Sequence, residues 1–295
     1  MRKFYLLISL MLPFMLCAQD ELLNELEDSL STDTAVRAAF KGLKVVNFES
    51  TKLAHKNSLV FIVSHRFGTV KNGFDDFFGL DEAVTQLKFI YGITDWLNAG
   101  IARSSFQKTY GAHLKYRIFQ QNTTGNPITV AGYNLITVNT ELDKDAFSDL
   151  KFSDRLSYTS QLIVSHKASD RLTVMIAPTY LHENLATRSF VMLRDETLLE
   201  FDEENDQFAV GVGGRFKLTK RWSVNVDYGI HLNRNKNSVY NDPLSIGVDL
   251  ETGGHVFQMH FTNAQPMFEN GFISRGSGDW GEGDFYFGFN LSRTF

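Results

Sequence analysis

The sequence predicts an all-β fold: a transmembrane antiparallel up-and-down β-barrel of about twelve strands, which follows a cleaved signal peptide. Three observations lead to this prediction. The chain begins with a targeting segment, most of the remaining residues alternate with period two, and the connections between the alternating runs are short and long in turn. After the targeting segment, no run of about 18 apolar residues is present, so we expect no transmembrane helix.

The first residues have the pattern of a secretory signal. Met1–Lys3 is positively charged, Phe4–Leu16 is apolar, and small Ala18 precedes acidic sequence. This order predicts a signal peptide at residues 1–19 that is removed from the mature protein. The only cysteine, Cys17, would leave with it, because bulky Leu16 argues against lipidation of that cysteine. One cysteine also excludes a disulfide scaffold.

The next segment, residues 20–56, leaves two alternatives open. Its first part is acidic and places Leu22, Leu23, Leu26 and Leu30 on one helical face. This pattern suits either a periplasmic tether or a helix that docks, for example at the mouth of the main domain. The sequence around Lys44–Val46 is ambiguous in the same way, since it suits a short strand or part of a plug.

Residues 57–295 form the predicted barrel domain, and alternation runs through them. In one run, Tyr110, Ala112 and Leu114 are apolar or small, whereas Lys115 and Arg117 belong to the intervening, largely polar set. Successive side chains of a strand point to opposite faces, so such a run has one apolar face and one polar face. The twelve predicted strands are 57–68, 83–92, 97–104, 109–119, 127–138, 154–165, 172–181, 207–218, 223–230, 244–251, 255–262 and 283–295.

Connection length distinguishes a membrane barrel from a soluble β-sandwich, which also alternates. Short connections such as 93–96 and 219–222 take turns with long ones such as 182–206 and 263–282, with 105–108 as the exception. Outer-membrane barrels have this arrangement, with tight periplasmic turns and longer outside loops. The sequence therefore predicts a barrel in the outer membrane of the cell, with the N- and C-termini in the periplasm.

Aromatic residues gather near the predicted periplasmic turns. Tyr91, Trp96 and Trp222 lie there, where outer-membrane barrels have an aromatic girdle at the lipid interface. The chain ends on Phe295, and a terminal aromatic residue after an alternating strand resembles the signal that the barrel-assembly machinery recognises. Arg293 departs from that signal, because an apolar residue is usual two positions before the end. We expect outer-membrane lipid and this machinery as partners.

The inward faces of the strands carry the residues that would line the lumen. Seven of the charged residues are positive and three are negative, so an open lumen would favour anions. In the alternative, these side chains pair across the lumen and fill it. One pairing register across the turn near residue 220 keeps the apolar faces together and places Arg215 opposite Asp227. The candidate lumen residues are Arg66, Lys88, His113, Lys115, Arg117, Arg155, Arg215, Lys217, Asp227, Asp249, Glu251 and His260.

Several classes of function find no support in the sequence. The net charge of −5 gives no reason to expect nucleic-acid binding. His255 and His260 point to opposite faces of a strand, as does each Ser–His neighbour pair, so neither makes a metal site or a catalytic dyad within its strand. We therefore expect no catalytic residues, no bound metal and no cofactor.

The chain contains seven short motifs, at residues 64–68, 91–95, 103–106, 251–258, 260–263, 278–280 and 287–290. These motifs resemble those of a family of outer-membrane β-barrel proteins of unknown function from Gram-negative bacteria. The resemblance runs from about residue 40 to the end, and the Gly-Gly-His block is its most specific part. It implies an outer-membrane barrel and brings no activity or catalytic residues with it.

Together these features predict a passive pore for small hydrophilic solutes, favouring anions, with no covalent chemistry. A barrel with a filled lumen is the alternative, acting through its outside loops or through a periplasmic partner. An outer-membrane lipid enzyme is a third hypothesis, but no motif for such an enzyme is present. The twelve-strand size does not decide between a filled and an open lumen, because eight-strand barrels are filled and those with sixteen or more leave a channel.

Overall fold

A computed structural model describes residues 35–36, 39–142, 149–185, 188–192 and 198–295. The predicted signal peptide (1–19) and the leucine-faced segment (20–30) lie outside the described residues. In the part of the chain that is described, no helix is long and apolar enough to cross a membrane.

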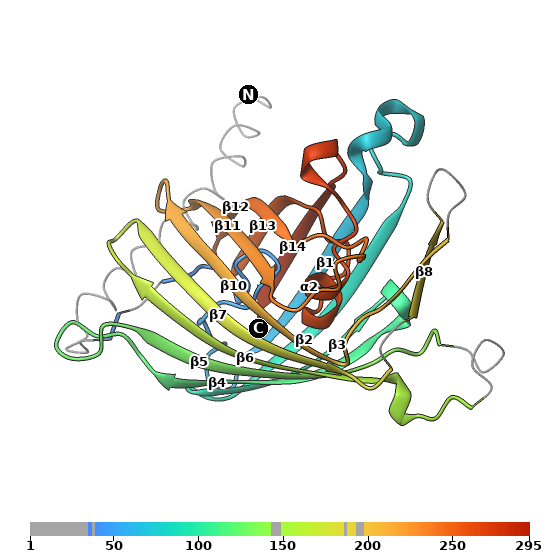
Figure 1. The fold of residues 1–295 in the computed structure, drawn as a ribbon. Coiled ribbons are helices and arrows are strands. Elements are labelled where there is room, and N and C mark those ends of the chain that lie inside the picture. The colour runs from blue at the N-terminus through green and yellow to red at the C-terminus, as the bar shows by residue number, and fades with distance from the viewer. Residues whose placement is uncertain (1–34, 37–38, 143–148, 186–187, 193–197) are drawn as a thin grey trace, which may run out of the picture.

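Twelve antiparallel strands form a closed barrel, as predicted (Figure 1). Each barrel strand pairs with the barrel strands that precede and follow it in the chain. The first strand, β1, pairs with the last, β14, and this pairing closes the sheet. All twelve predicted strands are present, with boundaries that differ by at most three residues. The barrel strands are β1 (Leu59–Thr69), β2 (Ala83–Thr94), β3 (Leu97–Ser104), β4 (Tyr110–Phe119), β5 (Thr129–Val138), β6 (Leu156–Lys167), β7 (Leu172–Glu183), β10 (Asp206–Lys217), β11 (Trp222–His231), β12 (Leu244–Thr252), β13 (His255–Thr262) and β14 (Tyr286–Thr294).

The two ends of the barrel differ in their connections. At one end, called the turn end here, the connections are 95–96, 120–128, 168–171, 218–221 and 253–254. The first and last strands also begin and finish there, where the Leu59 N–H donates to the Phe295 carbonyl at 3.2 Å. The opposite, loop end has connections 70–82, 105–109, 139–155, 184–205, 232–243 and 263–285. The connection 184–205 contains a separate two-stranded sheet of β8 (Arg188–Met192) and β9 (Leu198–Asp202).

The predicted register across the β10–β11 turn is wrong by two residues. Arg215 lies opposite Asn225, and Asp227 lies opposite Gly213. The turn is tighter than predicted because the Thr219 side chain accepts hydrogen bonds from the N–H groups of Arg221 and Trp222, which closes a short turn. The expected pairing of apolar with apolar faces is kept, but Arg215 and Asp227 are not partners across the strands.

The outside of the barrel is apolar and the inside of the strands is largely polar. Ile101 is 62% exposed and Leu114 is 49% exposed on the outer face. Inward Asn98, Ser223 and Ser245 have no exposed surface. A closed barrel satisfies all backbone groups of its strands within the sheet, and lipid can then contact the apolar outer side chains. The alternation therefore places lipid outside this sheet and polar contacts inside it.

A charge on the outer face tests this assignment. The Ile101→Lys substitution places an ammonium at the middle of β3 and should lower the free energy of unfolding from a bilayer by about 2–4 kcal/mol. The matched control is Val239→Lys, because Val239 is 39% exposed but lies in the loop-end connection 232–243. Denaturant unfolding of both variants in lipid vesicles measures the difference, and equal stabilities would mean that lipid does not cover β3.

Candidate functional site

The lumen is occupied by a segment of the chain itself, residues 39–56, called the hairpin here. It enters from the turn end, where the Val36 N–H donates to the Gln121 carbonyl at 2.7 Å. It returns to the same end, where the Asn57 N–H donates to the Gly92 carbonyl at 2.7 Å. Every residue from 40 to 51 is buried. The part of the 20–56 segment that the structure describes thus lies mainly inside the barrel, as the blue trace in Figure 1 shows.

The tip of the hairpin is held by one carboxylate of the barrel wall. Lys44 and Glu49 pair across the hairpin, and the Val45 N–H donates to the Phe48 carbonyl at 2.8 Å. Asp227 Oδ2, from β11, accepts the N–H groups of Val46, Asn47 and Phe48 at 2.9, 2.8 and 3.1 Å. Three successive backbone donors that converge on one carboxylate form an anion-binding concavity. In this structure a wall residue fills it.

Amide side chains of the hairpin and the wall secure the tip further. Asn47 donates to Ser245 and Thr262, both at 3.0 Å, and its Oδ1 accepts from Arg66 Nη2 at 3.0 Å. Gln258 Nε2 donates to the Val45 carbonyl at 2.9 Å. Buried polar groups outside regular structure need such partners, and here strands β1, β11, β12 and β13 supply them. The hairpin is thus fitted to this wall by hydrogen bonds rather than by a covalent link.

A buried ion cluster joins the hairpin to strands β2 and β4. Glu49 Oε1 lies 2.6 Å from Lys88 Nζ on β2, and Oε2 lies 3.0 Å from Lys115 Nζ on β4. Lys44 Nζ lies 3.8 Å from Glu49 and 3.8 Å from Glu269. Burial alone would raise the pKa of Glu49, but the nearby lysines hold it well below its ordinary value. The Glu49 carboxylate is therefore ionised within a surplus of positive charge.

A second segment fills the lumen from the loop end. The connection between β13 and β14 folds inward and contains the short helix α2 (Glu269–Ser274), which Figure 1 places within the ring of strands. Arg275 forms a bidentate ion pair with Glu183 of β7, at 2.8 and 2.7 Å. This segment meets the hairpin directly, because Lys44 Nζ donates to the Met267 carbonyl at 3.1 Å. We call residues 263–275 the inner loop.

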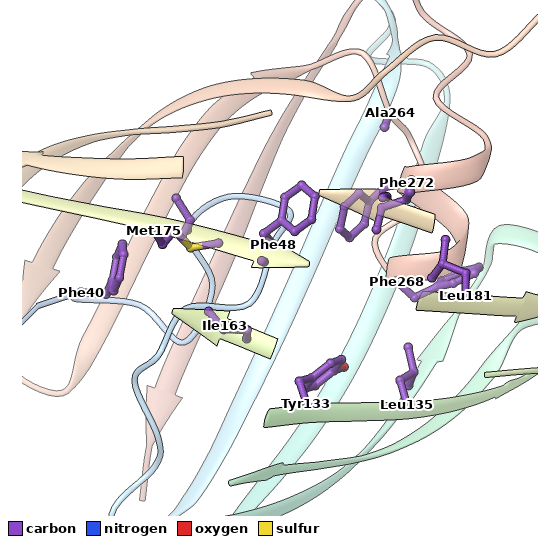
Figure 2. Packing of buried hydrophobic residues seen from close by; sticks show 14 residues of the cluster. Phe40, Phe48, Tyr133, Leu135, Ile163, Met175, Leu181, Ala264, Phe268 and Phe272 are labelled. Atoms are coloured by element: carbon purple, nitrogen blue, oxygen red, sulfur yellow. The ribbon is translucent and has the colours of Figure 1, made fainter. Parts of the chain in front are cut away.

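An apolar cluster seals the contact between the two segments. Phe48 of the hairpin packs edge-on against Phe272 of the inner loop, with ring centroids 4.9 Å apart. Figure 2 shows these rings beside inward side chains of β5, β6 and β7. Edge-to-face pairs add about 0.5–1.5 kcal/mol to the burial of the rings. The inward wall residues of this cluster are Tyr133, Leu135, Ile163, Met175, Ala177, Leu181 and Ala209.

This apolar part of the lumen was not predicted from the sequence. The predicted lumen residues are charged residues and histidines, although strand parity also points these apolar wall residues inward. A strand that is apolar on both faces is buried on both faces. Met175 and Ala177 give such a signal, because they alternate with outward Val174 and Ile176. This signal could have identified β7 as packed against something inside the barrel.

Most of the predicted lumen residues lie inside, and several contact the hairpin. Those that bind it directly are Arg66, Lys88, Lys115, Arg215 and Asp227, and Arg215 donates to the Ala39 carbonyl at 3.0 Å. The others inside the barrel bind or pack against wall residues or are simply buried. Asp249 accepts from Gln258 at 2.9 Å, the His113 ring lies 5.3 Å from that of Tyr133, and His260 is 1% exposed.

The remaining four predicted lumen residues lie at the ends of the barrel. Arg117 and Lys217 are half-buried at the turn end, where Glu251 is 42% exposed and pairs with Lys41 of the hairpin. Arg155 was predicted in a strand, but it ends the 3-10 helix η3 (Ser153–Arg155) at the loop end and donates to the Asn139 carbonyl. The strand begins one residue later, at Leu156, so Arg155 lies at the rim rather than within the lumen.

The four predicted interface aromatics all lie at the turn end. Their exposed fractions are 45% for Tyr91, 55% for Trp96, 38% for Trp222 and 63% for Phe295. Exposed aromatic rings at the end of an apolar band match the position of a membrane-interface girdle. All four rings thus lie at the end of the barrel where the interface girdle was predicted. Their contact with lipid stays a prediction.

A recess in the wall at Gly211 receives the Phe48 ring. A larger side chain at Gly211 would fill this recess and so test whether Phe48 holds the hairpin. A Cβ atom at Gly211 would lie 2.4 Å from the Phe48 ring, so Gly211→Val must displace that ring. Overpacking of this kind costs about 1–3 kcal/mol and should loosen the hairpin. The measurement is the rate at which a hydrophilic maleimide labels Val46→Cys, since Val46 is 1% exposed.

We expect labelling in the Gly211→Val background to be faster by about tenfold or more, since 1.4 kcal/mol corresponds to a factor of ten. The control is Gly125→Val, because Gly125 lies in the turn-end connection beside Asn122 alone. Unchanged labelling in both backgrounds would show that Phe48 does not hold the hairpin in the lumen.

Among solved structures, several porins and channels are similar in shape at low sequence identity. The NanC porin is 10% identical, with a TM-score of 0.46 over 80% of this chain and 98% of that chain. The KdgM porin is 8% identical, with a TM-score of 0.45 over 81% of this chain and 99% of that chain. The COG4313 outer membrane channel from Pseudomonas putida F1 is 14% identical, with a TM-score of 0.48 over 83% and 98%.

No curated protein matches the sequence. A family model does match, over residues 40–295, which include the hairpin, the inner loop and all strands of the barrel. This agrees with the family resemblance of the sequence motifs and with the apolar outer face of the closed sheet. The chain belongs to the family described as membrane bound beta barrel domain (DUF5777).

Proposed function

We propose that the protein is an outer-membrane channel for small hydrophilic solutes, closed in this structure by the hairpin and the inner loop. One observation carries the proposal: the hairpin enters and leaves at the same end and is held to a polar wall by hydrogen bonds and ion pairs. A segment attached in this way can withdraw without threading through the barrel or breaking a strand. Its withdrawal would expose polar and charged side chains on the walls formed by β11 to β14 and by β1 to β4, as a passage for hydrophilic solutes requires.

The same proposal assigns an orientation. The turn end faces the periplasm and the loop end faces outward, which is the arrangement of tight turns and long connections in outer-membrane barrels. Both barrel termini then lie in the periplasm, and β14 with Phe295 is available to the barrel-assembly machinery. The hairpin is thereby a periplasmic gate, and it acts by position alone, without covalent chemistry.

The charge of the wall favours anions. Arg66, Lys88, Lys115 and Arg215 lie inside the barrel at 5% exposure or less, against wall carboxylates at Asp227, Asp249 and Glu183. Of these carboxylates, Glu183 is paired with Arg275 of the inner loop. When the hairpin is out of the lumen, Glu49 no longer neutralises Lys88 and Lys115. Positive side chains that line a pore select for anions.

A second candidate function is a closed barrel that acts through its connections. The apolar cluster between the hairpin and the inner loop favours it, because Phe48, Phe272 and Ile163 are fully buried. Burial of each such side chain stabilises the filled state by roughly 1.5–3 kcal/mol. Under this alternative the hairpin is a permanent part of the core and never leaves.

Removal of one charge separates the two candidates. Glu49→Gln leaves Lys88 and Lys115 buried without a carboxylate, and loss of one partner from a buried ion pair costs about 3–5 kcal/mol. Withdrawal of the hairpin lets water reach both lysines, so the variant should open far more often than the wild type. We expect an increase of about a hundredfold in open probability, since 3 kcal/mol is about two factors of ten.

The measurement is single-channel conductance of the full mature chain in a planar bilayer, with reversal potentials under a salt gradient. Glu282→Gln is the matched control, because Glu282 forms an exposed ion pair with Lys71 at 2.7 Å, outside the lumen. Anion-selective steps in Glu49→Gln and wild-type behaviour in Glu282→Gln support the channel. Silence of folded Glu49→Gln, with folding checked by heat-modifiable gel mobility, would favour the permanently filled barrel.

A further inference from the structure

The ion cluster around Glu49 has the geometry of a binding site with its ligand in place. Lys88 and Lys115 come from β2 and β4, and each directs its ammonium at a different oxygen of one carboxylate, at 2.6 and 3.0 Å. The side chains of Glu49, Lys88 and Lys115 are 1%, 5% and 3% exposed. Charge-assisted hydrogen bonds of this length are among the strong ones in proteins.

The two lysines belong to the rigid wall, whereas the carboxylate belongs to the removable hairpin. Lys88 also donates to the Tyr133 hydroxyl at 3.4 Å, and its ammonium lies 5.3 Å from the centre of that ring. His113 packs beside Tyr133 on the neighbouring strand. The wall side of the cluster is therefore fixed by strand geometry and would remain when Glu49 departs.

A small cavity extends from the same place toward the inner loop. It measures about 10 Å³, and its lining includes Lys88, His113, Tyr133 and Glu269, with Gln86 and Thr137 among the polar neighbours. A cavity of this size holds about one water molecule. The polar groups around it can hydrogen-bond a ligand that is larger than the Glu49 side chain once the hairpin is withdrawn.

We propose that Lys88 and Lys115 form a carboxylate-binding site for the solute that crosses this barrel, and that Glu49 occupies this site in the closed state. The inference rests on the proposed channel function and names its substrate class: small solutes that bear a carboxylate. Such a solute competes with Glu49 for the two ammonium groups. It therefore opens the gate and is then bound between the ammonium groups of Lys88 and Lys115.

The competition can be measured without any conductance. The full mature chain with Val46→Cys is folded into lipid vesicles, and labelling by a hydrophilic maleimide reports withdrawal of the hairpin. The probe is sodium propanoate at 100 mM, which is the Glu49 side chain as a free molecule. Sodium chloride at the same ionic strength is one control, and propanamide added to that chloride is the other, because it has nearly the same shape without the charge.

We expect propanoate to speed labelling about fivefold, the factor for a ligand at about four times its Kd, and propanamide to leave the rate unchanged. Lys88→Gln with Lys115→Gln should abolish the propanoate effect, whereas Lys71→Gln at the exposed pair with Glu282 should keep it. Equal rates in propanoate and chloride with the wild-type lysines would overturn the site.

A second measurement applies if the double variant Lys88→Gln with Lys115→Gln does not fold. In folded Glu49→Gln, the permeability of propanoate relative to sodium should fall at least severalfold when Lys115→Gln is added. If the variant with Lys115→Gln conducts and its permeability ratio of propanoate to sodium is unchanged, the carboxylate site is refuted and the channel function is retained. A silent Glu49→Gln chain refutes the channel, and the labelling rates still decide whether the lysines bind a free carboxylate.

Discussion

The structure depends on one constraint: backbone groups within a bilayer must find their partners inside the protein. The pairing of β1 with β14 meets this constraint, because it closes the sheet and leaves no strand edge in lipid. With lipid outside, closure also places the polar faces of β1 to β4 and of β11 to β14 inward. The interior then needs partners for side chains such as Arg66, Asp227 and Asn290, and the hairpin supplies them with its backbone groups and with Asn47 and Glu49. The close fit of the hairpin is thus a direct consequence of the polar lumen.

The interior combines two kinds of contact with different consequences. On the side of β11 to β14 and β1 to β4, the hairpin is held by hydrogen bonds and ion pairs that water can replace. On the side of β5 to β10, Phe48 and the inner loop form an apolar cluster that excludes water. The polar contacts give the hairpin one register in the barrel, and the apolar cluster keeps it there. Under the proposed function, a solute that competes for the ion pairs weakens the first set, and withdrawal of the hairpin also requires Phe48 to leave the second.

The sequence predicted the barrel well because strand parity and connection length are local properties. It predicted the turn register incorrectly because the Thr219 side chain, rather than hydrophobic alternation, sets the tight turn. The hairpin could not be placed from sequence, since residues 39–56 have no period of their own and take their shape from distant side chains such as Asp227 and Gln258. Glu49 was missed as a site residue for the same reason: nothing local connects it to Lys88 and Lys115.

The proposed channel requires that the hairpin closes the lumen and can leave it. Thr51 and Ser165 join the hairpin to β6, with hydroxyl oxygens 2.6 Å apart, so cysteines at both positions bring a disulfide within reach. The most direct measurement is single-channel conductance of Glu49→Gln with Thr51→Cys and Ser165→Cys, before and after reduction, with the disulfide verified by mass spectrometry. We expect the oxidised protein to be silent and the reduced protein to conduct. Equal conductance in the two states would contradict withdrawal of the hairpin.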